Sequence, residues 1–109
     1  RPEVMGVGPI PAVQNLLKNT GLSISDFDVI ESNEAFAAQA IAVNRGLDLD
    51  PKVVNPNGGA IALGHPVGAT GAIITLKALY QLEIINGKRA LITMCIGGGQ
   101  GIALAIERI

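Results

Sequence analysis

The stretch ALITMCIGGGQGIALAI, residues 90–106, contains no charged residue and is almost as long as a membrane-spanning helix, which needs about 20 apolar residues. Its centre, GGGQG, would interrupt such a helix because glycine is a poor helix former. Each half is a continuous apolar run of the kind that forms a buried β-strand. We therefore expect two antiparallel strands, RALITMCI (89–96) and GIALAIERI (101–109), joined at a glycine bend and covered on both faces.

Helical and apolar segments alternate upstream of this pair. Ile10, Val13, Leu16 and Leu17 recur at helical spacing, and Gly21 offers a stop. The expected elements are a helix over 10–21, a strand in 26–32, a helix over 33–46, a brief strand in 50–55 and a helix over roughly 67–85. The last helix is expected to bury Ala72, Ile73, Leu76, Leu79 and Leu82.

This order predicts an α/β fold with a mixed, mostly parallel sheet, helices on both faces and the last two strands antiparallel. The 109 residues fit one domain, and 49% of them are hydrophobic, enough for a real core. Aromatic residues make up only 3%, so the core is expected to be aliphatic.

Composition excludes several classes of protein and site. A net charge of −1 without a basic stripe argues against nucleic-acid binding. One cysteine permits no internal disulfide and suits a reducing compartment, and one histidine with one cysteine is too few ligands for a metal site. The start, RPEVMGVGPIP, does not resemble a signal peptide, and the end, ERI, is not an SKL-type signal. We expect a cytoplasmic protein with no membrane partner.

The segment NPNGGAIALGHPVGATGA, residues 55–72, contains the only histidine, His65. Gly59 and Gly64 match part of a phosphate-binding loop, but His65 and Pro66 stand where that loop requires Lys and Ser or Thr. The GGGQG segment is followed by a strand rather than a helix, so it is not a dinucleotide fingerprint either.

Three candidate residues follow or end predicted strands, where α/β sheets place their chemistry: Asn33, His65 and Cys95. A helix N-terminus would keep His65 neutral, able to accept a proton and to donate a hydrogen bond to an oxyanion. His65 could equally be an ordinary polar residue at a helix start. Cys95 reads either as a small buried hydrophobe or as a reactive thiol beside free N–H groups, and Asn33 reads as a helix cap.

Three motifs, in this order, resemble the C-terminal half of thiolases: NEAFAAQ (33–39), residues 55–72 quoted above, and CIGGGQGIALAIER (95–108). MGVGPIPA (5–12) is similar to the segment that opens that half. The resemblance implies a thiolase C-terminal domain over residues 1–109 and an acyltransferase of fatty acid metabolism. Such enzymes interconvert acetyl-CoA and acetoacetyl-CoA, or longer 3-ketoacyl-CoA, through an acyl-cysteine intermediate.

The resemblance also implies roles for individual residues. His65 would activate the nucleophilic cysteine and help to hold the thioester oxygen, and Cys95 would carry protons to and from substrate. Asn33 would order a water in one oxyanion hole, and the backbone N–H of Gly97 would contribute to the other.

Met5 and Phe36 resemble residues that line the acyl and pantetheine pocket of thiolases. The resemblance implies coenzyme A thioesters as substrates, no resident cofactor and a homodimer or homotetramer. The family's nucleophilic cysteine lies in the N-terminal half, whereas Cys95 belongs to another motif, and the first strand of the C-terminal half is expected before Arg1. We therefore expect a fragment of a longer chain that is inactive alone.

Two alternatives stay open. A ketoacyl-synthase-like condensing enzyme would need a second histidine beside its nucleophile, and this sequence has one. A non-catalytic CoA-binding or interaction module derived from half a thiolase would not need every matched catalytic position.

Overall fold

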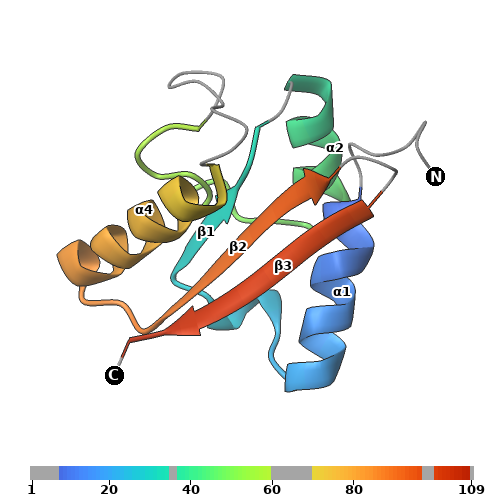
Figure 1. The fold of residues 1–109 in the computed structure, drawn as a ribbon. Helices are drawn as coiled ribbons and strands as arrows, with labels where there is room; N and C mark the ends of the chain where they lie inside the picture. Colours follow the sequence, from blue (N-terminus) through green and yellow to red (C-terminus); the bar gives the residue numbers. More distant parts are fainter. Residues whose placement is uncertain (1–7, 35–36, 60–69, 97–99, 109) are drawn as a thin grey trace.

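The structure is a computed structural model that describes residues 8–34, 37–59, 70–96 and 100–108. Its sheet has the strand order β1-β2-β3, with β1 and β2 parallel and β2 and β3 antiparallel (Figure 1). The elements are α1 (Pro9–Thr20), the 3₁₀ turn η2 (Ile24–Asp26), β1 (Val29–Ser32), α2 (Ala37–Gly46), α4 (Thr70–Ile85), β2 (Arg89–Ile96) and β3 (Gln100–Glu107). This confirms the expected α/β class and the antiparallel last pair.

Both faces of the sheet carry helices, because side chains of β2 alternate between two core clusters. Leu91 packs with Val13 of α1 and Val43 of α2. Its neighbour Ile92 packs on the other face with Ala78 of α4. Figure 1 shows α1 and α4 on opposite sides of the sheet. The core is aliphatic, as the composition predicts.

The first helix, Pro9–Thr20, begins and ends within one residue of the expected range 10–21. Proline occupies its first turn, where a missing N–H costs no intrahelical bond. Gly21 adopts a left-handed φ of 73° and donates its N–H to Leu17 O at 2.9 Å, which satisfies a terminal carbonyl. Val13 is fully buried beneath the sheet.

The buried face of α4 differs from the expected one. Ile74, Ala78 and Leu82 are buried, whereas Ile73, Leu76 and Leu79 are 40–52% exposed. Ala72 is exposed as well, so Leu82 alone of the expected set faces the core. Apolar residues surround almost the whole helix, and the spacing therefore could not identify the side that the sheet covers.

Two strand expectations also need correction. The brief strand expected in 50–55 is a single parallel bridge between Val54 and Ile30. Pro51 lacks an N–H for a ladder and Asn55 turns the chain with a left-handed φ of 46°, so no longer pairing forms. The last strand is not covered on both faces within the described residues, since Ile102 and Leu104 are about half exposed.

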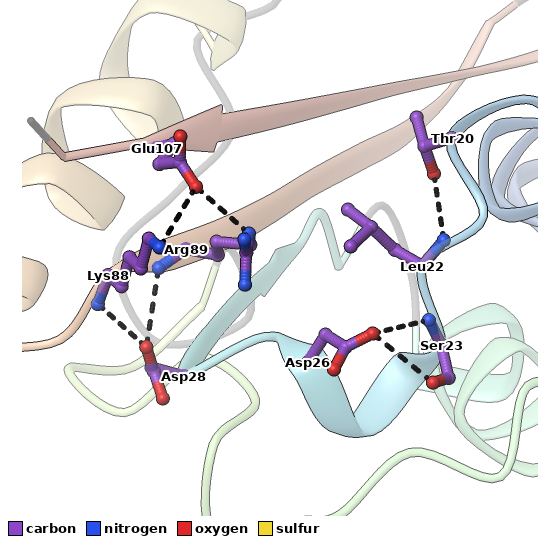
Figure 2. A network of polar contacts seen from close by, with 8 residues as sticks. All are labelled: Thr20, Leu22, Ser23, Asp26, Asp28, Lys88, Arg89 and Glu107. Carbon is purple, nitrogen blue, oxygen red and sulfur yellow. Dashed lines mark hydrogen bonds and ion pairs between the residues drawn. The ribbon is translucent and has the colours of Figure 1, made fainter.

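A polar network ties the strands together at the end of the sheet where β1 and β2 begin (Figure 2). Asp28 Oδ2 accepts the backbone N–H groups of Lys88 and Arg89 at 2.7 and 3.3 Å. Glu107 Oε1 pairs with Arg89 Nε at 3.1 Å and with Lys88 Nζ at 3.7 Å. Asn33 and Cys95, the two candidate catalytic residues that the structure describes, lie at the opposite end, where β1 and β2 finish. Among the described helices, none has the length and apolar character needed to cross a bilayer.

Candidate functional site

Two of the three sequence candidates lie at the same edge of the sheet. Asn33 directly follows β1, and Cys95 is the penultimate residue of β2. The parallel register pairs Ser32 with Thr93, and the Asn33 N–H donates to Thr93 O at 3.0 Å. The predicted site residues His65, Gly97, Met5 and Phe36 lie outside the described residues. Residues 35 and 36, between Asn33 and the first residue of α2, Ala37, are not described either, so the cap at Asn33 stays a prediction.

Buried polar side chains concentrate at this edge. Among the described residues they are Glu31, Ser32, Asn33, Gln39 and Thr93. Glu31 and Ser32 end β1, Asn33 directly follows it, and Thr93 of β2 pairs with Ser32. Polar groups removed from water cost free energy unless they find partners, so such a cluster at strand ends is typical of a functional site.

The side-chain amide of Asn33 is one of the buried polar groups at this edge. The residue is 3% exposed, and its Nδ2 has no hydrogen-bond partner among the described residues. A buried amide of this kind usually binds a protein group or an ordered water. Asn33 therefore offers a donor to a water or ligand at the strand edge.

The Cys95 thiol is buried on the α1 side of the sheet. Leu91, Thr93 and Cys95 share one face by the two-residue period of a strand, and Leu91 packs against α1. Cys95 lies opposite Gly101 of β3, where a Cβ would overlap the backbone carbonyl of Gly8. The start of α1 thus packs against β3 directly beside the cysteine.

Residues 55–59 follow Val54, which is bridged to Ile30 of β1, and precede the part of the sequence that contains His65. Asn55 binds β1 through its side chain: its Oδ1 accepts the Ser32 N–H and its Nδ2 donates to Ser32 O, both at 2.8 Å. A Cβ at Gly59 would overlap the Glu34 carboxylate, so glycine lets Glu34 lie against the loop.

Sequence reasoning missed a charged pair between β1 and α4. Lys77 Nζ lies 3.5 Å from Glu31 Oε1 and donates to Gly58 O at 2.5 Å. Burial raises the pKa of Glu31, Lys77 acts against this rise, and Glu34 adds to it. The sequence did contain a signal for this pair. Glu31 is the one charged residue of β1, and Lys77 directly follows the long uncharged segment 53–76.

The family model described as the thiolase C-terminal domain matches residues 1–108. The chain belongs to the thiolase family. This confirms the likeness carried by the three motifs.

Individual thiolases match the chain along almost its whole length. It is 63% identical over 108 residues to beta-ketothiolase BktB of Cupriavidus necator and 54% identical over 107 residues to acetyl-CoA acetyltransferase of Paracoccus denitrificans. These matches cover 99% and 98% of the chain but 27% of each relative.

The thiolase fold is shown directly by solved structures. The chain superposes on human mitochondrial 3-ketoacyl-CoA thiolase in complex with CoA with a TM-score of 0.97 and 52% identity. The match covers all of this chain and 28% of the human one.

Proposed function

We propose that this chain is the C-terminal part of a thiolase that interconverts acetyl-CoA with acetoacetyl-CoA or a longer 3-ketoacyl-CoA. The observation that carries the proposal is the buried Asn33 amide, whose Nδ2 has no hydrogen-bond partner among the described residues and which lies level with the end of β2 that contains Cys95. The named activities of the relatives, a beta-ketothiolase and an acetyl-CoA acetyltransferase, support the same reaction class.

In the thiolysis direction, His65 takes the proton of a nucleophilic cysteine supplied by the N-terminal part. The thiolate attacks the 3-keto carbonyl, the Cα–Cβ bond breaks, and Cys95 protonates the acetyl-CoA carbanion. Cys95 then removes the proton of CoA, whose thiolate attacks the acyl-cysteine and regenerates the nucleophile.

Developing oxyanions need hydrogen-bond donors placed in advance. We propose that Asn33 holds a water for the first oxyanion and that the N–H of Gly97 serves the second. Buried donors are effective here because the protein has already removed the water that would compete with them. CoA thioesters are substrates in this scheme, and no resident cofactor is required.

The same proposal includes the residues of the substrate pocket, the metabolic role, the location and the oligomeric state of the enzyme. Met5 and Phe36 would line the acyl and pantetheine channel. The enzyme would act in fatty acid metabolism as a cytoplasmic homodimer or homotetramer. Gel filtration with light scattering would measure the oligomeric state.

The proposal is tested by purifying the full-length protein and the 109-residue chain and following loss of acetoacetyl-CoA with added CoA. We expect turnover by the full-length protein and none by the chain alone, which lacks the second cysteine. Cleavage by the isolated chain would contradict the proposed division of labour. Full-length protein that binds CoA without turnover would favour the non-catalytic binding module.

A further inference from the structure

One ammonium group joins three separate parts of the candidate site. Lys77, two turns into α4, contacts the Glu31 carboxylate of β1 and the Gly58 carbonyl of the loop. One helical turn later, Gln81 Oε1 accepts a hydrogen bond from Asn57 Nδ2 at 2.9 Å. The same face of α4 therefore binds two successive residues of the loop.

The ion pair of Glu31 and Lys77 is an unfavourable way to lower the free energy of folding, because both charges are largely removed from water. The Glu31 side chain is 1% exposed and the Lys77 side chain 20% exposed. Removing two charges from water is unfavourable, and well-packed apolar replacements of a buried ion pair are often as stable or more so. Glu31 Oε2 also has no hydrogen-bond partner among the described residues, so the carboxylate is only partly compensated.

The positions of the partners in the sequence suggest what the pair does. Gly58 lies just before residues 60–69, which include His65, and Lys77 lies in the helix that follows them. The hydrogen bond from Lys77 to the Gly58 carbonyl therefore joins the loop before that segment to the helix after it. Glu31 lies two residues before Asn33, so the same lysine also fixes the strand end that presents Asn33.

We propose that Lys77 and Glu31 are positioning residues for the thiolase reaction. They hold the flanks of the His65 segment and the Asn33 strand end in one fixed arrangement, without touching substrate. This inference rests on the proposed function. Because misplacement of reacting groups by about 1 Å can cost about 10²-fold in rate, a lost tie should lower kcat rather than substrate affinity.

The test uses the full-length protein with Lys77→Met, Lys77→Arg and the double variant Glu31→Leu/Lys77→Met. Lys18→Met, at an exposed position in the last turn of α1, is the matched control. We expect Lys77→Met to lower kcat for acetoacetyl-CoA thiolysis about tenfold or more with little change in KM, and Lys77→Arg to recover part of the loss. The double variant should regain thermal stability without regaining kcat.

Wild-type kcat in the folded double variant would overturn the proposal, because the pair would then be structural only. A second measurement, hydrogen exchange of the backbone amides of residues 55, 57–59 and 33–34, does not depend on the reaction. Exchange there should rise in Lys77→Met and not in Lys18→Met, while the β2 core stays protected. Unchanged exchange also overturns the inference, whereas absence of thiolysis by the wild type contradicts the proposed function itself.

Discussion

The side chain of Asn55 replaces a neighbouring strand at the last residue of β1. It binds both backbone groups of Ser32, accepting from the N–H and donating to the carbonyl at 2.8 Å each. Asn55 itself has a left-handed φ of 46°, a conformation that asparagine tolerates better than most residues. One side chain thus ends the pairing with β1 and anchors the loop that follows.

Asn55→Ala should destabilise the protein by about 3 kcal/mol, from two lost hydrogen bonds to half-buried backbone and the strain of alanine at this φ. Urea unfolding measures the change. Asn86→Ala is the control, because Asn86 also has a left-handed φ, 54°, but is exposed, and the side-chain hydrogen bond that its Oδ1 accepts from Arg108 lies at the surface, where it contributes little. The control should lose about 1 kcal/mol. Equal losses would mean that the bonds to Ser32 add nothing.

Gly101→Ala tests the close packing of α1 beside Cys95. The new Cβ would overlap the rigid backbone of Gly8, so we expect a loss of about 3 kcal/mol or more in the free energy of unfolding. In the matched variant Gly46→Ala, the Cβ would meet the flexible end of the Ile10 side chain, which can rotate away. That loss should be about 1 kcal/mol or less by the same urea titration.

Asn33→Ala should lower kcat for acetoacetyl-CoA thiolysis by about 10²–10³, the usual effect of losing one oxyanion-hole donor. Stability should change little, because the Asn33 Nδ2 has no partner among the described residues to lose. Steady-state kinetics of the full-length protein measure the rate. A wild-type kcat would leave Asn33 as a structural cap only.

His65→Ala and Cys95→Ser should affect different steps. Without His65, the nucleophilic cysteine is not activated, so the burst of acyl-enzyme should disappear. Serine at position 95 is a far weaker acid and should slow proton transfer to the acetyl-CoA carbanion, while acyl transfer from an activated thioester still occurs. Rapid-quench measurement of the acyl-enzyme separates the two, and identical defects would contradict these assignments.

Glu31→Gln should change how stability depends on pH. Burial raises the pKa of Glu31 above 4.5, so the native state holds the proton more tightly than the unfolded chain. This contribution to stability is present below the unfolded pKa and is lost as pH rises through the folded pKa. The stability of the wild type relative to the variant should therefore fall as pH rises above about 4.5. Urea titrations at several pH values measure this, and a constant difference would contradict the shift.

The extent of the fold that can be predicted from sequence depends on local signals. Proline and glycine define the limits of α1, because these residues act on their own backbone. The sequence predicts the antiparallel pair of β2 and β3 from two apolar runs separated by glycines. The periodicity of α4 could not predict its buried face. Leu76 and Leu79 are as apolar as Leu82, and only contact with β1 and β2 selects Ile74, Ala78 and Leu82.

The candidate site also has features that the sequence predicts and others that only the tertiary structure shows. The three motifs of the sequence determined the family and named Asn33, His65 and Cys95, because chemistry-bearing residues are recognised by their type and local setting. The ties from Asn55 to Ser32 and from Lys77 to Glu31 and Gly58 join residues 19 to 46 positions apart. Only the tertiary structure decided them, since a hydrogen bond or ion pair at that separation exists only after the sheet and α4 have brought its partners together.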